Sequence, residues 1–308
     1  MIYKFQNYAL KKRLCFMEIR VLRYFLTVAR EENITKAAEK LHITQPTLSR
    51  QLHQLEEELG KQLFKRGNHD IKLTTDGMLL RKRAEEIIDL VEKTETEMNS
   101  SNDELTGDIY IGAGETDAFR LVAGIVKKIQ NEHPQVTFHN ISCDSIDVID
   151  KLNKGLIDFG ILFEPADYTA FEYIKFPVCD TWGVLMRKDC DLAAGEYVTT
   201  EMLADRPLII SRQFMNSVDL SQWLGIPKEK IIVSATTNLI FNGSKLVEEG
   251  IGSAVTLDKL INCSGDSKLC FRPFYPPKYA QMYLVWKKYQ VFSKEAKRFL
   301  NDFRRLVK

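Results

Sequence analysis

The stretch ITKAAEKLHITQPTLSRQLHQLEEELG, residues 34–60, predicts two helices joined by a tight turn. One apolar stripe runs along the second helix, because leucines recur at i, i+4, i+7 and i+11 from Leu48. Pro46 fits the first turn of that helix, where a backbone N–H would have no helical partner. Thr35 is placed to cap the first helix. At ~100° per residue, polar residues occupy the side opposite the leucines: Thr47, Arg50, His53 and Gln54, with Ser49 on the flank.

The exposed start of the second helix suits a nucleic-acid groove. A recognition helix enters the major groove of DNA by its N-terminal end, where glutamine can pair with adenine and arginine with guanine. Backbone N–H groups at a helix start also attract phosphate. The alternative is an ordinary helical hairpin with a polar face, but the tight turn, Pro46 and the basic residues after Gly60 together favour DNA. The predicted DNA-binding residues are Thr35, Thr44, Gln45, Pro46, Thr47, Ser49, Arg50, His53, Arg66 and Lys72.

Residues 61–77, KQLFKRGNHDIKLTTDG, predict a short strand pair around Gly67 and Asn68. Basic residues in this wing would touch the DNA backbone and fix register without reading sequence. The acidic run from Glu56 to Glu58 lies at the far end of the preceding helix and is expected to stay outside the groove. Placement carries this argument, since the whole chain has a net charge of only +1.

A single long helix is expected over residues 76–101, which contain no proline and no glycine other than Gly77. A long helix with a narrow apolar seam usually pairs with a copy of itself. The alternative is a helix packed on its own domain, and the length without breaks favours self-pairing. The seam falls at heptad-like spacing: Leu80, Ala84, Ile87, Val91 and Met98.

Beyond a linker at SSNDELTG, strand and helix patterns alternate, which predicts α/β structure with parallel or mostly parallel sheets. About 200 residues are generous for one such sheet and comfortable for two small ones. Helices are expected over residues 118–132 and 145–154. Strands are expected at DIYIGAG, QVTFHNIS, IDFGILF, WGVLMRK, PLIIS, IIVSAT and GSAVT.

Composition and motifs point away from membranes and catalysis. No apolar run approaches the ~18 residues of a membrane span, and the sequence start lacks a secretory pattern. The six cysteines have no zinc-like spacing, so reduced thiols and a cytoplasmic location are expected, with a redox pair as the alternative. Histidines show no metal-ligand spacing, and complete G-x-G-x-x-G and G-x-S-x-G motifs are absent. We expect no metal, no cofactor and no enzymatic activity.

The segment FLTVAREENITKAAEKLHITQPTLSRQLHQLEEELGKQLFKRGNHDIKLTTDG strongly resembles the winged helix-turn-helix of LysR-type transcriptional regulators. The matching features include Ala37, Ala38, TQPTLSRQL, LEEELG, Arg66 after LF, and Gly77 after LT. Looser matches at GDIYIGAGET, HPQVTF, KGLIDFGILF and GIGSAV extend the resemblance to the C-terminus.

The resemblance implies a three-part architecture. It consists of an N-terminal all-α winged helix-turn-helix, a long linker helix, and a two-lobed α/β effector domain like a periplasmic binding protein. Such chains pair through the linker helix, and many assemble as tetramers. The implied parts are residues 17–76, 77–104 and 105–308, with lobe I at 107–178 and 272–308 and lobe II at 179–271.

Two departures from the family pattern stand out. The family usually begins near Met17, so residues 1–16 are an N-terminal extension, interpreted as an upstream start or a tail rather than as a basic arm on DNA. The family also often has proline where this chain has residues 119–121 and Thr256. Both latter positions lie near the expected pocket, so the ligand class of relatives does not transfer.

An effector is expected in the cleft between the lobes, at the carboxyl ends of strands. Glu115 and Asp117 oppose a simple anion there, so the ligand is expected to carry a donor or a positive group. The predicted contacts are Thr116 and Ser145, from the resemblance, and Ser211, Arg212, Thr237 and Asn238, from strand ends of lobe II. The alternatives are helix caps for the first two and an ordinary surface position for the arginine.

The sequence thus predicts a sequence-specific DNA-binding transcriptional regulator. A small-molecule co-inducer would favour one closure of the lobes and change how subunits hold DNA half-sites. One alternative is a constitutive DNA binder whose C-terminal domain serves oligomerisation or a protein partner. A remote alternative is a solute-binding protein, which the winged motif disfavours. The expected partners are double-stranded DNA, the effector and further copies of the chain, without a membrane.

Overall fold

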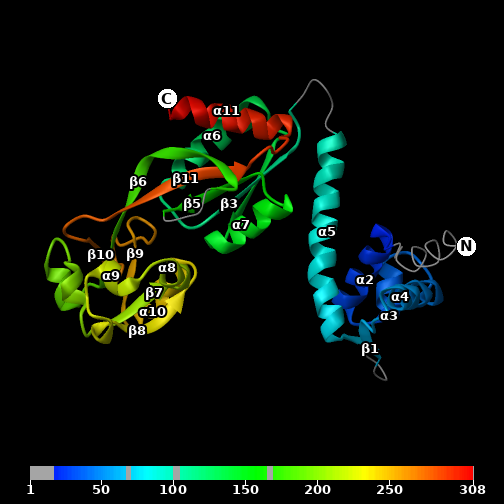
Figure 1. The fold of residues 1–308 in the computed structure, drawn as a ribbon, viewed down its shortest axis with the longest axis horizontal. Helices are drawn as coiled ribbons and strands as arrows, with labels where there is room; N and C mark the ends of the chain where they lie inside the picture. Colours follow the sequence, from blue (N-terminus) through cyan, green and yellow to red (C-terminus); the bar gives the residue numbers. More distant parts are fainter. Residues whose placement is uncertain (1–16, 67–70, 100–104, 165–168, 308) are drawn as a thin grey trace, which may run out of the picture. The chain divides into compact units, whose positions relative to one another are not determined.

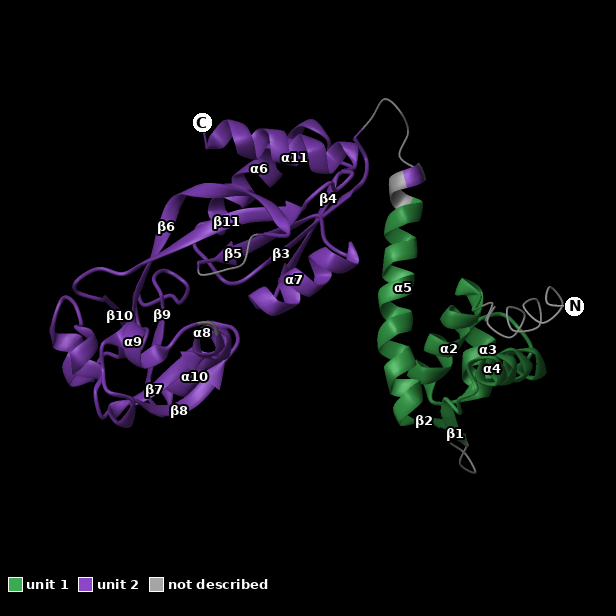
Figure 2. Cartoon of the chain, in the orientation of Figure 1, with its two compact units in different colours: residues 1–95 green, residues 96–308 purple. Residues whose placement is uncertain are grey.

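The computed structural model describes residues 17–66, 71–99, 105–164 and 169–307. The chain divides into two compact units, residues 1–95 and 96–308, shown in green and purple in Figure 2. The extension 1–16 and the turn at Gly67 and Asn68 lie outside the described residues, so the expectations for them stay predictions. The first unit holds the helix-turn-helix stretch, and the second holds the alternating strands and helices.

The first unit contains the helix pair, the strand pair and the long helix that the sequence predicts (Figure 1). Pro46 lies in the first turn of α4, and Gly60 ends this helix with a left-handed φ of 63°. The two wing strands pair antiparallel. The elements are α2 Ile19–Glu31, α3 Ile34–Lys40, α4 Gln45–Leu59, β1 Phe64–Arg66, β2 Ile71–Leu73 and α5 Thr75–Asn99.

The core of the first unit confirms the predicted leucine stripe. Leu48, Leu52 and Leu55 are buried against Phe25 and the neighbouring helices. The predicted cap of α3 is wrong: the Lys36 N–H donates to the Asn33 side chain at 3.0 Å, and Thr35 is exposed. Asparagine one position earlier has the extended backbone that an N-cap needs.

Much of the apolar side of helix α5 packs against the core of the first unit. Ala84 and Ile88 belong to the core of the first unit, so the alternative of a helix packed on its own domain holds for this part. Leu79, Leu90 and Met98 are exposed in the single chain and supply an apolar surface for a partner helix. Pairing through α5 stays a prediction. Two further members of the expected seam pack partly against the same core: Leu80 and Ile87.

Lobe I of the second unit is a five-stranded sheet in the order β4-β3-β5-β11-β6. Helices α6 and α11 cover one face, and α7 covers the other (Figure 1). The core lies between the sheet and the helix pair, around Phe159, Phe299 and Phe303. Its elements are β3 Asp108–Ala113, α6 Phe119–Glu132, β4 Thr137–Ser142, α7 Ser145–Lys154, β5 Phe159–Phe163, β6 Phe171–Arg187, β11 Tyr279–Lys287 and α11 Lys294–Leu306.

Lobe II has the strand order β8-β7-β9-β6, with β10 on the other side of β6. Helix α10 packs on one face, and the short helices α8 and α9 pack on the other. Its elements are the 3₁₀ helices η1 Asp191–Ala194, η2 Thr200–Leu203 and η3 Lys228–Lys230, with β7 Pro207–Ser211, α8 Arg212–Ser217, α9 Leu220–Leu224, β8 Ile232–Thr237, α10 Ile240–Glu248, β9 Ser253–Leu257 and β10 Leu269–Pro273.

The lobes share one strand. β6 pairs with β11 up to Thr181 and with β9 from Trp182 onward, so its two halves belong to different sheets. The chain returns to lobe I through residues 274–278, between β10 and β11. The expectation of mostly parallel sheets is only half right. β3, β4 and β5 are parallel, as are β7, β8 and β9, but β6, β10 and β11 pair antiparallel with their neighbours.

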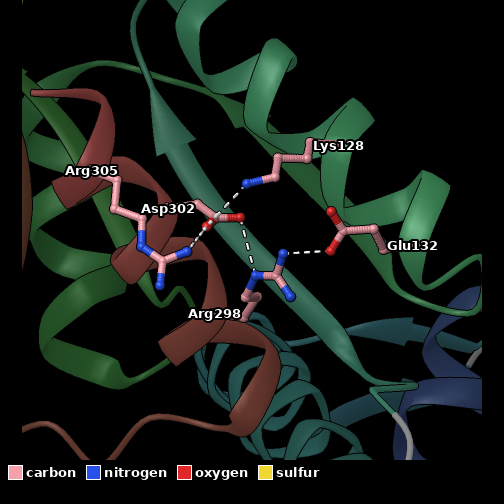
Figure 3. A network of polar contacts seen from close by, with 5 residues as sticks. All are labelled: Lys128, Glu132, Arg298, Asp302 and Arg305. Carbon is pink, nitrogen blue, oxygen red and sulfur yellow. Dashed lines mark hydrogen bonds and ion pairs between the residues drawn. The ribbon is translucent and has the colours of Figure 1, made fainter.

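A buried carboxylate ties α11 to α6 in lobe I (Figure 3). The Asp302 side chain is 3% exposed and accepts from Arg298 Nε at 3.1 Å. Lys128 and Arg305 each approach it to 3.5 Å. Arg298 also donates to Glu132 of α6 at 2.5 Å. A buried charge is tolerated when paired charges and hydrogen bonds surround it, so this network fixes how α11 packs against α6.

Candidate functional site

The start of α4 presents the predicted reading residues to solvent. Gln45, Pro46, Thr47, Arg50 and His53 are exposed, and Ser49 is half-exposed. The Thr44 hydroxyl lies 2.8 Å from the Thr47 hydroxyl and caps no backbone N–H. N–H groups of the first turn are therefore left to an outside acceptor such as phosphate.

One shallow groove gathers most of this front. Its residues come from successive turns of α4, and Arg50 and His53 share it with amide and hydroxyl groups that can bond to base edges. His53 Nδ1 lies 3.5 Å from Glu57. The groove runs along one face of α4, from its first turn to Glu57 near its C-terminal end, and its N-terminal part is the end that enters DNA in a helix-turn-helix. It is lined by Gln45, Pro46, Ser49, Arg50, His53, Gln54 and Glu57.

The three acidic residues from Glu56 to Glu58 have different environments. Glu56 Oε1 accepts from the N–H groups of Leu63 and Phe64 at 2.7 and 3.1 Å, so this residue ties α4 to the wing. Glu58 is exposed and lies outside the surface groove of α4, whereas exposed Glu57 lines it on the same side as Arg50 and His53, contrary to the expectation that the run stays away from the reading surface. No separate role was predicted for Glu56 from the sequence, because only the folded structure reveals its partners in the wing.

The wing places two lysines side by side. Lys65 of β1 and Lys72 of β2 are cross-strand partners, and both are exposed. Lysines at such a position can contact the phosphate backbone without reading sequence. Arg66 belongs to β1, opposite Ile71. The wing therefore offers a positive edge next to α4, as the sequence predicts.

A cavity of about 110 Å³ lies between the lobes of the second unit. Lobe I contributes the loops after β3, β4 and β5, and lobe II contributes the ends of β7, β8 and β9. The lining residues from lobe I are Gly114, Glu115, Cys143, Asp144, Phe163 and Glu164. Those from lobe II are Trp182, Ser211, Gln213, Phe214, Thr237, Asn238, Leu239, Ile240, Val255, Thr256, Leu257 and Leu260.

The structure brings three of the six predicted effector residues to this cavity: Ser211, Thr237 and Asn238. Arg212 is exposed and absent from the lining. Thr256, one of the departures from the family pattern, is part of the lining, whereas Phe119 is not. Ligand binding by any of these residues stays a prediction.

Thr116 and Ser145 have other partners. The Thr116 hydroxyl lies 2.6 Å from Asp180 Oδ2 and accepts from the Ala118 N–H at 3.1 Å, so it stabilises the start of α6. Burial raises the pKa of Asp180, and the Thr116 hydrogen bond opposes this rise. The Ser145 hydroxyl accepts from Gln213 Nε2 at 2.7 Å. Neither residue lines the cavity.

Comparison with known proteins assigns both units. Residues 19–78 match the family described as "Bacterial regulatory helix-turn-helix protein, lysR family", and residues 102–308 match "LysR substrate binding domain". The chain belongs to the LysR family. Its winged domain and its two-lobed domain are thus the DNA-binding and substrate-binding parts of a LysR-type regulator.

Individual relatives of this LysR chain are moderately similar. The transcriptional regulator BsdA of Bacillus subtilis (strain 168) is 38% identical over 146 residues, which are 47% of this chain and 50% of BsdA. AlsR of the same organism is 30% identical over 243 residues, 77% of this chain and 79% of AlsR. The match thus spans about half of the length of BsdA and most of AlsR.

Solved LysR structures share the fold. CbnR, a LysR family transcriptional regulator, superposes with a TM-score of 0.75 over 95% of this chain and all of CbnR, at 18% identity. Full-length CbnR in complex with its target DNA gives a TM-score of 0.74, also at 18% identity. This likeness confirms the predicted fold class: a winged helix-turn-helix, a long helix and two α/β lobes.

Two cross-lobe contacts of the LysR chain were not predicted from its sequence. The side-chain amide of Gln213 makes two hydrogen bonds to Ser145: Nε2 donates to the Ser145 hydroxyl at 2.7 Å, and Oε1 accepts from the Ser145 N–H at 2.8 Å. Glu115 accepts from the Ile240 N–H at 2.5 Å. Because Ser211 caps α8, the side chain that turns toward lobe I is Gln213 rather than the predicted Arg212. Only the paired lobes reveal these partners, so no local sequence signal could identify them.

Cysteines and acids in the LysR chain form no metal site among the residues that the structure describes. Cys143 lines the cavity, and burial, followed by the charge of Asp147, raises its pKa to about 11. A thiol with such a pKa is protonated at neutral pH and is a poor nucleophile. Within the described residues, no helix combines the length and the apolar character that crossing a bilayer needs.

Proposed function

We propose that this protein regulates transcription by binding an operator with an affinity that changes when a small molecule occupies the cavity between its lobes. The observation that carries the proposal is the cavity lining, which comes from both lobes. A ligand there contacts both lobes at once and so stabilises one closure relative to another. The effector would act without a cofactor, and we assign the cavity no catalytic role.

On the DNA side, the front of α4 enters the major groove, and Lys65 and Lys72 contact the backbone. Support comes from the exposed residues at the helix start and from the paired lysines of the wing. Two copies would pair through the exposed apolar residues of α5, and two pairs would form a tetramer on two half-sites. The protein would work in the cytoplasm, where its DNA lies.

Within the cavity, we assign orientation of the effector to Ser211, Thr237 and Asn238. Their polar groups lie among apolar and aromatic lining, which is the usual composition of a ligand pocket. Thr237 already donates to the Leu239 carbonyl at 2.5 Å, so its hydroxyl offers an acceptor. Asn238 can offer both a donor and an acceptor.

The test couples ligand binding to DNA binding. Metabolites that raise the melting temperature of the full chain are added to fluorescence-anisotropy titrations with DNA upstream of its own gene. The active compounds should change the Kd for DNA severalfold. Asn238→Ala should weaken their stabilisation, and Asn216→Ala, an exposed asparagine of the same lobe, should not.

Two outcomes would contradict the proposal. Stabilisation that survives a combined Ser211→Ala and Asn238→Ala change, in a folded protein, would place the ligand outside the cavity. Compounds that bind in the cavity and leave the Kd for DNA unchanged would favour the constitutive alternative.

A further inference from the structure

We propose that the effector is an organic cation, with an amine or amidine group on a small apolar or aromatic body. The inference rests on the proposed function, since it names the chemical class that the cavity takes. Its basis is the charge of the lining. Three lining residues are acidic, Glu115, Asp144 and Glu164, and none is lysine, arginine or histidine.

No lysine or arginine pairs directly with these three acids in the part of the chain that the structure describes. Glu164 accepts from the Tyr283 hydroxyl, which raises the pKa of Tyr283 to about 12. Arg120, close in sequence to the cavity, donates to Asp117 at 2.6 Å. A positively charged ligand would supply the missing counter-charge, most strongly beside Glu115 and Asp144, which are half-buried, whereas Glu164 is exposed at the rim.

Two helix starts at the cleft, those of α10 and α7, are already occupied by carboxylates, and the third, that of α8, is capped by Ser211. Glu115 accepts from the Ile240 N–H at the start of α10. Asp144 caps α7 by accepting from the Asp147 N–H at 3.1 Å. At the α7 or the α10 start, an anionic effector would therefore have to displace an acid of the protein and remain beside two others. The cleft therefore disfavours anions for two reasons: its lining is negatively charged, and the N–H groups at the starts of α7 and α10 already donate to carboxylates of the protein.

Aromatic rings in the lining can also bind a cation, through cation–π interactions. Trp182 and Phe214 both line the cavity, with ring centroids 4.8 Å apart, and Phe163 lines it from lobe I. Organic cations bind over the faces of such rings, most strongly over tryptophan. The volume of 110 Å³ is close to that of a cavity of about 150 Å³ that holds benzene. The occupant is thus a small molecule with one ring or a short chain.

Cys143 allows the charge of the cavity to be measured directly. The full chain is treated separately with a trimethylammonium-ethyl and a sulfonatoethyl methanethiosulfonate, and labelling of each cysteine is followed by peptide mass spectrometry. Exposed Cys179 in the same molecule is the control. The ratio of cationic to anionic labelling rates should be roughly tenfold higher at Cys143 than at Cys179, because a negative cleft concentrates cations. Equal ratios, or faster anionic labelling at Cys143, would overturn the inference.

A second experiment tests occupancy with two probes of one shape. Benzylamine at millimolar concentration should slow labelling of Cys143 by an uncharged reagent, and benzoate should not. Protection by benzylamine should fall in Glu164→Gln and persist in Glu229→Gln, a surface acid of lobe II. Absent protection by benzylamine, or stronger protection by benzoate, would refute the cation assignment.

The same samples separate the two proposals. If an anion occupies the cavity and changes the Kd for DNA, the regulatory proposal stands and the charge inference fails. If benzylamine protects Cys143 while cationic ligands leave the Kd for DNA unchanged, the charge inference stands and the regulatory proposal fails.

Discussion

At the scale of single residues, recognition of bases and contact with the DNA backbone are assigned to different elements, α4 and the wing. Arg50 lies in the groove with amide and hydroxyl groups, whereas Lys72 lies on the wing opposite Lys65. Arginine that reaches into the major groove of DNA can discriminate between bases. Lysine on the wing contacts phosphate groups, which are the same in every DNA sequence. Substitutions at the two positions should therefore have different signatures.

Arg50→Ala should raise the Kd for the operator by roughly 5- to 150-fold, or about 1–3 kcal/mol, and that for random DNA much less. Lys72→Ala should weaken both and lower the salt slope by about one unit. Anisotropy titrations over a range of salt concentrations measure both effects, with exposed Lys228→Ala of the second unit as the control. Equal losses on operator and random DNA for Arg50→Ala would contradict the groove assignment.

Residues on one helix face could be predicted from the sequence, because helical spacing alone places Leu48 in the core and Arg50 outside it. The cleft residues could be predicted only in part. Thr237 and Asn238 follow a recognisable strand and line the cavity. Gln213 and Glu115 owe their partners to the other lobe, which lies far away in the sequence.

At the scale of elements, Gly77 explains how α5 meets the wing. A Cβ at this position would lie 2.1 Å from the Leu63 carbonyl oxygen, and Thr74 N–H donates to that same oxygen at 2.9 Å. The clash involves backbone that is held by the wing, so a side chain cannot be accommodated by a rotamer change. Glycine is required here for close approach and not for an unusual φ.

Gly77→Ala should destabilise the first unit by about 1–3 kcal/mol, as expected for an overpacked contact, although alanine itself favours helix. Gly124→Ala in α6 is the matched control, since a Cβ there meets nothing within 4 Å. It should gain up to about 1 kcal/mol. In urea unfolding, far-UV circular dichroism follows both units and tryptophan fluorescence follows only the second, which holds all three tryptophans. A transition seen by circular dichroism without a fluorescence change therefore reports the first unit. A neutral Gly77→Ala would disprove the packing argument.

Element prediction failed where an edge strand breaks the usual pattern. The first half of β6, FEYIKFPVCD, contains Pro177 and several charged residues, so it does not read as a strand. It tolerates them because β6 is the edge strand of the lobe I sheet. β10 and β11 were also missed, since their pairing with β6 depends on the return from lobe II.

At the scale of the whole second unit, two contacts hold the lobes together across the cavity. Gln213 bonds twice to Ser145, and Glu115 bonds once to the α10 start. Each neutral hydrogen bond is worth about 0.5–1.5 kcal/mol, and the one to the Glu115 carboxylate about 1.5–3 kcal/mol. The closed arrangement is therefore stabilised by an amount that a modest ligand can match or exceed.

Gln213→Ala should open the cleft more often, because it removes both bonds to Ser145. Labelling of Cys143 by an uncharged thiol reagent should accelerate roughly tenfold, the equivalent of about 1.4 kcal/mol. Gln222→Ala, an exposed glutamine of the same lobe, should leave the rate unchanged. An unchanged rate in both variants would mean that Gln213 does not restrain the lobes.

The shared strand β6 also determines the order in which the chain can be built. All of lobe II lies between β6 and β11, yet β11 is the neighbour of β5 inside the lobe I sheet. A nascent chain therefore completes lobe II while the edge of β5 still lacks its partner, for on the order of ten seconds at ribosomal speed. Chains that stop before Tyr279 would carry an unpaired strand edge, the kind of surface that promotes aggregation. Translation from Tyr279 to Lys287 is thus the step that protects lobe I.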